Sequence, residues 1–482
     1  MAAKSARWKK VLVAVIAALA ALPLLGLLIF DQDISEIAGV GTGYTAKVMC
    51  SSVFVSGRDP REIEKVDLSP TSGYPISVRL DRQKKQVTAS ILGLFSKRAV
   101  YREGLGCTVV VDVSDEELKA QAAAAPVAPP GLSRDLPWPR GGKVDTQNLP
   151  SGADRKKLDQ ALDFAFTDPA PGRPVGTRAV VVVYQGRIIA ERYAPGFSSD
   201  TPLLGWSMTK SVTNALVGIL VRQGRLDIHE PAPVPQWKGP DDPRAQITVD
   251  QLLRMESGLK FVEEYEKNIA SDVNVMLFNH GDMAAFAADM PLSAEPDSVW
   301  SYSSGTSMIL ARMVRQAVGG TGEDYLAFPR RELFDKLGMS SAVLEPDASG
   351  TFAGASYLYA SARDWARFGL LFLRDGVWNG ERILPQGWVA YSSTPTPAAP
   401  HGGYGAQFWL NAGSPGNQED RWLPKLPVDL YSARGHDGQY VTIIPSHDLV
   451  VVRLGFTPNH LQAWDHQKFL SLIIEALGNQ NP

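Results

Sequence analysis

The sequence contains few of the residues that bind metal ions or react as thiols. Its 482 residues include two cysteines and seven histidines, with no H-E-x-x-H motif, no C-x-x-C pair and no closely spaced pair of histidines. A zinc mechanism therefore has no recognisable ligand set, and we expect neither a metal nor another cofactor. An excess of positive charge is also missing, because 48 Lys and Arg stand against 51 Asp and Glu. Nucleic acid is therefore not an expected partner.

Hydrophobic residues, in contrast, are plentiful. They make up 44% of the chain and aromatic residues 9%, which is enough to build a large packed core. A chain of this length is expected to form two or three folding units, at roughly 150 residues per domain.

One long uncharged segment lies near the amino terminus. Four basic residues precede an uncharged run from Val11 to Phe30, about the ~20 residues that cross a bilayer as a helix. We predict that residues 1–32 are a single-pass anchor in the cell inner membrane, with the rest of the chain on the periplasmic side. A cleaved signal peptide is the alternative, although the sequence after Phe30 offers no small-residue cleavage site.

Cys50 and Cys107 both follow this segment, in a compartment where a disulfide would persist. We predict that they are bonded to each other; two buried free cysteines are the alternative. Residues 33–115 are predicted to form a small β-rich module, because short extended segments alternate with turn residues. These segments are Val53–Val55, Ile76–Leu80, Val87–Ile91 and Cys107–Val111.

Residues 116–144 are rich in alanine and proline and are predicted to be a linker or an extended strap. The remainder, 145–482, is predicted to be one large domain. It opens on a β-hairpin, Ala179–Tyr193, and ends on a second, Gln439–Leu454, with helical patterns between them. An α/β (α+β) fold follows, with one antiparallel sheet completed by both ends of the domain and a helical layer packed on it.

Ser207 and Lys210 are the residues most suited to covalent chemistry. Ser207 lies in the first turn of a predicted helix whose later turns are almost wholly apolar and therefore buried. A spacing of three places both side chains on one face of the helix. Burial would lower the pKa of Lys210 toward that of a useful base, which could take the hydroxyl proton of Ser207.

The S-x-x-K pattern alone is weak, because Ser257-Gly258-Leu259-Lys260 also fits it. Gly258 interrupts this second match near a helix end, so we interpret it as structural. A Ser-His-Asp triad is disfavoured because Gly205-Trp206-Ser207-Met208-Thr209 lacks the second glycine of a G-x-S-x-G elbow.

Two later motifs give the first match its context: Trp300-Ser301-Tyr302-Ser303-Ser304-Gly305, and Gly435-His436-Asp437-Gly438-Gln439. In order and spacing the three segments resemble the S-x-x-K, Y-x-N and K-T-G signatures of the serine β-lactamase and penicillin-binding-protein superfamily. The resemblance covers about residues 177–477 and is closest to the class C-like esterases, D-aminopeptidases and 6-aminohexanoate-dimer hydrolases. It implies a β-lactamase-like fold for this part of the chain.

The resemblance also implies roles for individual residues. Ser207 would be the acylated nucleophile, Lys210 its base, and Tyr302 a proton shuttle whose pKa is lowered by the neighbouring lysine. The backbone N–H groups of Ser207 and Gln439 would form the oxyanion hole. Candidate substrate-binding residues are Trp206, Ser304, His436, Asp437 and Gly438.

Two departures from the family pattern bear on the substrate. Ser304 replaces the Asn of Y-x-N, and His436 replaces the Lys of K-T-G, which weakens the cationic grip on a substrate carboxylate near neutral pH. The expected substrate is therefore a small-molecule ester, or an amide whose binding depends less on a negatively charged group. A penicillin-binding D,D-peptidase, a D-aminopeptidase and a non-catalytic cell-envelope binding protein are the alternatives.

Overall fold

The computed structural model describes residues 32–126, 131, 133, 135–239, 241–319 and 322–478. The predicted membrane span from Val11 to Phe30 lies outside these ranges. Within them, no helix is both long enough and apolar enough to cross a bilayer.

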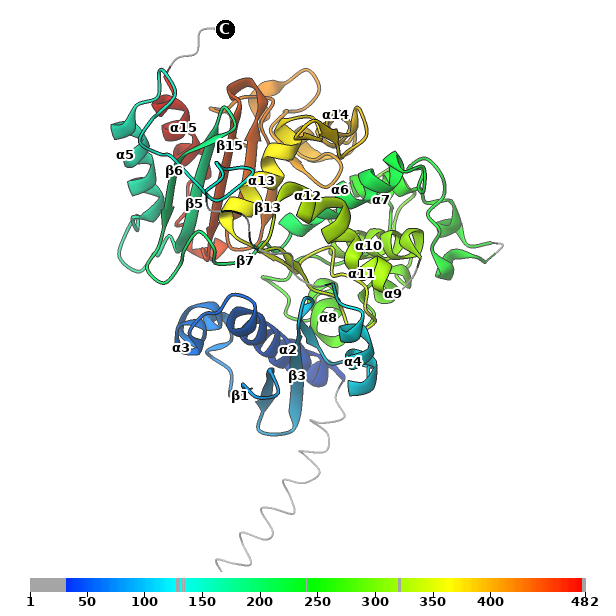
Figure 1. The fold of residues 1–482 in the computed structure, drawn as a ribbon. Helices are drawn as coiled ribbons and strands as arrows, with labels where there is room; N and C mark the ends of the chain where they lie inside the picture. The colour runs from blue at the N-terminus through cyan, green and yellow to red at the C-terminus, as the bar shows by residue number, and fades with distance from the viewer. Residues whose placement is uncertain are drawn as a thin grey trace, which may run out of the picture.

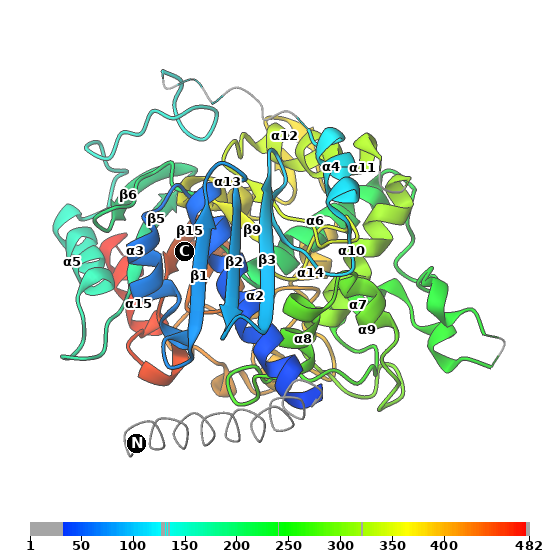
Figure 2. The same ribbon diagram turned by 90° about the horizontal axis from the view of Figure 1, so that it is seen from below.

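The amino-terminal module combines one long helix with an antiparallel sheet. The four strands pair in chain order, and Figure 2 shows them lying across the long helix α2. On its other side α2 packs against α8 (Asp272–Asn279) of the large domain. The two helices lie so close together that a Cβ added at Gly43 would be 2.8 Å from the Cβ of Phe278. The module comprises α2 (Gln32–Phe54), α3 (Pro60–Glu62), β1 (Ile76–Asp81), β2 (Gln86–Ile91), β3 (Phe95–Arg102) and β4 (Gly106–Val109).

Two predictions for this region were wrong in detail. Val53–Val55 is not extended, because Val53 and Phe54 form the last turn of α2. Its β-branched residues favour a strand, but packing against the sheet decides the conformation of so short a segment. The predicted linker is also not wholly extended, because α4 (Asp115–Ala123) runs into it. A capping box between Ser114 and Glu117 starts this helix.

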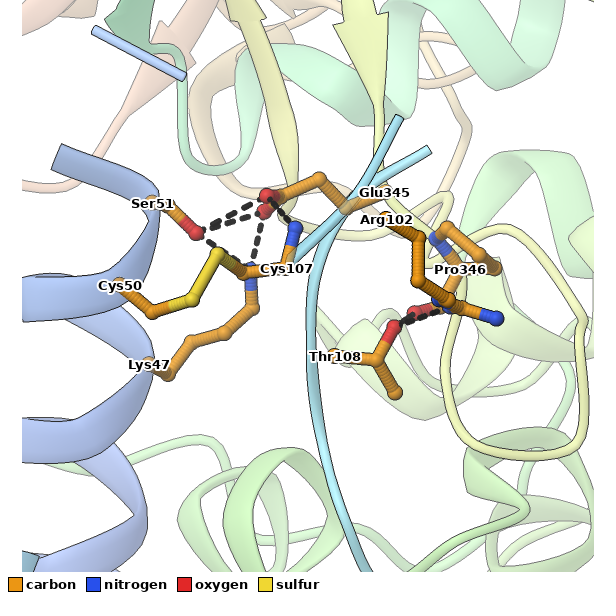
Figure 3. Close-up of a disulfide and its surroundings, with 8 residues drawn as sticks. All are labelled: Lys47, Cys50, Ser51, Arg102, Cys107, Thr108, Glu345 and Pro346. Carbon is orange, nitrogen blue, oxygen red and sulfur yellow. Dashed lines mark hydrogen bonds and ion pairs between the residues drawn. A yellow bond between two sulfur atoms is a disulfide. The ribbon is translucent and has the colours of Figure 1, made fainter. Parts of the chain in front are cut away.

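The disulfide between Cys50 and Cys107 is confirmed, and it joins α2 to β4. Closing a loop of 57 residues stabilises the module by about 4 kcal/mol in the chain-entropy model. Beside it, the buried carboxylate of Glu345 in the large domain accepts hydrogen bonds from Lys47, Ser51 and the backbone N–H of Cys107 (Figure 3). The disulfide therefore holds together the residues that surround this carboxylate.

The predicted antiparallel sheet from both ends of the large domain is confirmed. Its six strands run in the order β12-β13-β14-β15-β5-β6, so β15 from the end of the chain pairs with β5 from the start of the domain. Both predicted hairpins are present, whereas β12 and β13 were not predicted. The strands are β5 (Thr177–Tyr184), β6 (Arg187–Tyr193), β12 (Trp409–Leu410), β13 (Tyr431–Gly435), β14 (Gln439–Ile444) and β15 (Leu449–Gly455).

Helices cover both faces of this sheet (Figure 1). On one face α5 (Arg155–Phe166) and α15 (His466–Ala476) pack on alternate residues such as Val180 and Val451. On the other face α6 (Met208–Arg222) and α13 (Ala362–Leu373) contact the intervening residues, including Val181. The sequences of these strands are continuous hydrophobic runs because both faces of the sheet are buried.

The segment between the hairpins is mostly helical, as predicted. The capping box of Thr248 and Gln251 is present at the start of α7. The helices are α7 (Val249–Arg254), α8 (Asp272–Asn279), α9 (Met283–Ala288), α10 (Ser304–Val318), α11 (Glu323–Pro329), α12 (Asp335–Leu337) and α14 (Trp388–Ser392). The short strands β7 (Leu203–Leu204), β8 (Val343–Leu344) and β9 (Leu358–Ala360) form a small sheet, and β10 (Val377–Trp378) pairs with β11 (Glu381–Arg382).

Candidate active site

Ser207 occupies the N-cap position of α6, directly after the short strand β7. The preceding residue, Trp206, has a φ of +47°, a left-handed conformation that is unfavourable for a large side chain. This sharp turn places Ser207 at the amino end of a helix whose remaining turns are buried, where the helix dipole favours negative charge. Strained backbone of this kind occurs most often at functional sites.

Lys210 is almost completely buried, with 1% of its surface exposed, and its ammonium group has three partners. Its Nζ lies 3.0 Å from Ser207 Oγ, 2.9 Å from Ser304 Oγ and 3.1 Å from the carbonyl oxygen of Ala355. If the neutral amine donates its two N–H bonds to Ser304 and Ala355, its lone pair is directed at the hydroxyl of Ser207. The arrangement therefore suits proton transfer from Ser207 to Lys210.

Burial lowers the pKa of Lys210 to about 8, against a smaller opposing effect from the negative charge of Glu263. The direction is the one predicted from the sequence, because an ammonium loses hydration in the interior. About a tenth of the lysine is then uncharged at pH 7, and about half at pH 8.

Tyr302 also lies close to Ser207, whose side chain interacts with the phenol and opposes the rise of its pKa. Its ring belongs to an aromatic cluster with Trp300, Tyr404 and Trp409, which holds it in place. The three side chains predicted to react thus converge, although one belongs to a segment distant in the chain.

The predicted lowering of the Tyr302 pKa was wrong. The Lys210 Nζ lies over the face of the Tyr302 ring, 4.9 Å from its centroid. Burial of the phenol dominates and raises its pKa well above the usual range, with further increases from Tyr404 and Glu263. Tyr302 is therefore a protonated phenol, which can donate a proton but does not act as a resting phenolate.

Ser304 contacts the amine of Lys210 and is shielded from solvent. Its hydroxyl accepts from Lys210 and donates to Glu263, whose carboxylate also accepts from the Ser304 backbone N–H at 2.8 Å. Ser304 is 1% exposed and supports Lys210, while its predicted contact with substrate stays a prediction.

Glu263 was missed by the sequence analysis. It comes from the segment before α8, and no local pattern distinguishes it from its neighbour Glu264. Burial raises its pKa, whereas Lys210 and Ser304 act in the opposite direction. Only the three-dimensional arrangement shows that this carboxylate orients the hydroxyl that contacts the lysine.

The turn between β13 and β14 brings the third motif to the site. A Cβ at Gly435 would lie 2.1 Å from the carbonyl oxygen of Gly205, so only glycine allows this close approach to the segment before Ser207. Beyond it, the ring of His436 packs edge-on against Trp206 at 5.8 Å and against Tyr265 at 4.9 Å. Trp206 and His436 are therefore brought together, as predicted.

The remaining residues of this motif are buried. Asp437 is 4% exposed, and a Cβ at Gly438 would meet Arg453, so both are packed within the turn, and their predicted contact with substrate stays a prediction. The side-chain amide of Gln439 bonds the carbonyl oxygens of His436 and Gly455 and fixes the turn. The predicted oxyanion role of the Gln439 backbone N–H stays a prediction.

The second S-x-x-K match is structural, as interpreted. Ser257 is buried and accepts a weak bond from the backbone N–H of Leu259, while Lys260 is exposed. Gly258, with a φ of +72°, turns the chain between them.

Known proteins share both the sequence pattern and the fold. The chain is 28% identical over 327 residues to a 6-aminohexanoate-dimer hydrolase of Paenarthrobacter ureafaciens, covering 63% of this chain and 76% of the relative. Its fold is similar to that of a putative 6-aminohexanoate-dimer hydrolase from Bacillus anthracis, with a TM-score of 0.51, 22% identity and coverage of 69% and 85% of the two chains.

A putative β-lactamase from Bacteroides dorei has a similar fold, with a TM-score of 0.52, 17% identity and coverage of 67% of this chain and 97% of the other. The family model named Beta-lactamase matches residues 171–459, which is more than half of the sequence and includes Ser207, Lys210 and Tyr302. The resemblance found in the three motifs is therefore confirmed, and the chain belongs to the beta-lactamase family of hydrolases.

Proposed function

We propose that the protein is a serine hydrolase that cleaves an ester or amide bond through an acyl-enzyme on Ser207. The observation that carries this proposal is the buried amine of Lys210, held 3.0 Å from Ser207 Oγ by two other acceptors. The relative named as a 6-aminohexanoate-dimer hydrolase supports a small amide among the substrates.

In the first half-reaction Ser207 Oγ attacks the substrate carbonyl while neutral Lys210 takes its proton. The tetrahedral oxyanion would be stabilised by the backbone N–H groups of Ser207 and Gln439. Tyr302 gives its phenolic proton to the departing alcohol or amine and regains one from the Lys210 ammonium. The products of this step are the ester of Ser207, the free leaving group and a neutral lysine.

In the second half-reaction a water molecule attacks the acyl carbonyl. Its proton passes to Lys210 through Tyr302, and Ser207 leaves as a hydroxyl once it recovers a proton from the lysine. Both halves use the same three side chains and require no metal ion or organic cofactor.

The disulfide supports the proposed location outside the cytoplasm. Cys50 and Cys107 are oxidised in the folded protein, and such bonds persist mainly in oxidising compartments. We therefore propose that the hydrolase acts in the periplasm.

Labelling with a fluorophosphonate tests the nucleophile directly. We expect the wild-type protein to gain the mass of the probe on the peptide that contains Ser207, because the probe traps an activated serine. Ser207→Ala should gain none. Ser257→Ala is the matched control from the second S-x-x-K match, and it should be labelled as the wild type is. An adduct that persists in folded Ser207→Ala would refute the assignment.

The pH dependence of ester hydrolysis tests the base. Lys210 must be neutral to accept a proton, and its pKa is lowered to about 8. We therefore expect kcat/KM for p-nitrophenyl hexanoate to rise about tenfold per pH unit below pH 8 and to level off above it. Because the Tyr302 pKa lies far higher, no second decline should appear below about pH 10. A flat profile between pH 6 and 8 would contradict the role of Lys210.

A further inference from the structure

Large apolar side chains are exposed at one end of the amino-terminal module. Leu92 and Leu94 belong to the turn between β2 and β3, and Leu92 is 75% exposed. Tyr74, just before β1, and Ile37, in the second turn of α2, are exposed as well. Scattered apolar side chains are normal on a protein surface, but a group of them usually marks a surface that contacts something.

Leu92 also occupies a costly backbone position. Its φ is +52°, in the left-handed region where glycine or asparagine is usual at a turn. An exposed leucine is therefore kept at a place where a small polar residue would fold more easily and dissolve better.

The strand register and one helix contact place these residues at the same end. A Cβ added at Gly41 of α2 would lie 3.5 Å from Ile76, the first residue of β1. Ile76 is paired with Ile91, the last residue before the turn between β2 and β3. Ile37 precedes Gly41 by four residues, so it lies on the same face of α2 and one turn nearer the start of the helix. The apolar turn and Ile37 therefore lie at the end of the module where α2 begins.

The opposite end of the same sheet is polar. The turn between β1 and β2 is Arg82–Lys85, and all four of its residues are exposed. The carbonyl oxygen of Lys85 accepts from the backbone N–H of Tyr101, whose ring lies 5.7 Å from that of Phe54, the last residue of α2. The module thus has an apolar end where α2 starts and a basic end where α2 finishes.

The sequence before α2 indicates what contacts the apolar end. It predicts a membrane span from Val11 to Phe30, and α2 begins at Gln32, two residues later. The five residues from Gln32 to Ile37 advance only about 8 Å along a helix, so Ile37 and the turn beside it would lie close to the headgroups of that bilayer. Tyrosine and leucine are residues that proteins bury at such an interface.

The charges at this end favour a lipid surface without net charge. Asp33 and Glu36 are exposed in the first two turns of α2, close to Ile37, and anionic headgroups would repel them. The turn Leu92–Leu94 carries no charge at all. Contact at this end therefore depends on apolar burial and not on basic side chains.

We propose that the apolar end of the module, formed by Ile37, Tyr74, Leu92 and Leu94, rests in the interface of the membrane that the amino-terminal segment spans, and contacts zwitterionic phospholipid. The turn between β2 and β3 inserts its two leucines among the headgroups, which fixes the orientation of the module against the bilayer. This inference rests on the predicted span and does not depend on the chemistry proposed at Ser207.

Fluorescence quenching in the full-length protein tests this contact. The protein is inserted into phosphatidylcholine vesicles, and the dye NBD is attached to a cysteine introduced by Leu92→Cys or, as the matched control at the polar turn, by Lys84→Cys. The native cysteines do not react, because they are bonded to each other. A phosphatidylcholine that carries a nitroxide should quench the dye about threefold at position 92 and by less than about 1.2-fold at position 84. Sodium chloride at about 0.5 M should leave both values unchanged, because the contact is apolar.

Leu94→Asp, combined with labelled Leu92→Cys, should reduce the quenching to the level of the control, since a carboxylate opposes insertion. Its thermal unfolding should match that of Leu92→Cys, because the substitution lies at an exposed turn. Quenching that persists in this double variant would overturn the proposal. Equal quenching at positions 84 and 92, quenching at position 84 alone, or loss of quenching in salt would do the same.

Two further outcomes separate the surface contact from the span itself. If the vesicles retain the protein in alkaline carbonate but the dye at position 92 is not quenched, the span stands and the contact is refuted. Protection of that dye from aqueous iodide would then show that protein, and not lipid, covers the turn. If carbonate extracts the protein, the predicted span fails and the proposal fails with it.

Discussion

Lys210→Met is expected to lower kcat/KM for p-nitrophenyl hexanoate by about 10³-fold at pH 8, because a positioned general base contributes 10²–10⁴-fold. Methionine has a similar length and tolerates burial, so the substitution removes the proton acceptor without introducing a new buried charge. The rise of kcat/KM with pH up to about 8 should disappear together with the base. Steady-state kinetics between pH 6 and 10 measures both effects.

Lys260→Met is the matched control for this variant. It removes the exposed lysine of the second S-x-x-K match and should alter kcat/KM by less than twofold. Retention of a wild-type pH profile by folded Lys210→Met would show that another group accepts the proton.

Lys47→Met is expected to destabilise the protein by about 3–5 kcal/mol, because it leaves the carboxylate of Glu345 buried without its cation. Lys47 and Glu345 have side-chain exposures of 3% and 0%, so water cannot replace the lost partner (Figure 3). The loss should shrink as the pH falls, because protonation of Glu345 removes the uncompensated charge. Urea unfolding at pH 5 and pH 8 measures the difference.

Lys65→Met replaces an exposed lysine of the same module and should change the free energy of unfolding by less than about 0.5 kcal/mol. The double variant Lys47→Met with Glu345→Gln should recover part of the stability, since a neutral amide is less costly to bury. A loss below about 1 kcal/mol in Lys47→Met would show that the pair is not needed to hold the carboxylate.

Much of the fold could be predicted because its strongest signals are local. Hydrophobic runs broken by Gln185-Gly186 and by Pro445–Asp448 define both hairpins, and their position at the two ends of the domain implies a shared sheet. The helix α2 was missed because it is buried on both sides, between the module's sheet and α8, so it lacks the polar stripe that marks a surface helix. The strands β12 and β13 are short, and their pairing partners are set by tertiary contacts.

The candidate site was predictable to the extent that motifs specify it. Ser207, Lys210 and Tyr302 converge, whereas the supporting groups were not foreseen. Glu263 lies in an irregular segment, and its role depends on where that segment passes Ser304. The Tyr302 pKa was predicted with the wrong sign because the motifs suggest that a lysine lies near the phenol, but not that the phenol is completely buried in an aromatic cluster.

The hydrogen bonds to Glu345 also join two parts of the chain that recombination of the gene could separate. The family match begins at residue 171 and contains Glu345, but its donors Lys47, Ser51 and Cys107 all precede that boundary. A copy of the large domain made without the amino-terminal module would carry the Glu345 carboxylate at its surface, without these three donors. Water would solvate the exposed carboxylate, so such a copy would lose the contacts that join the two parts but would not need an uncharged residue at position 345.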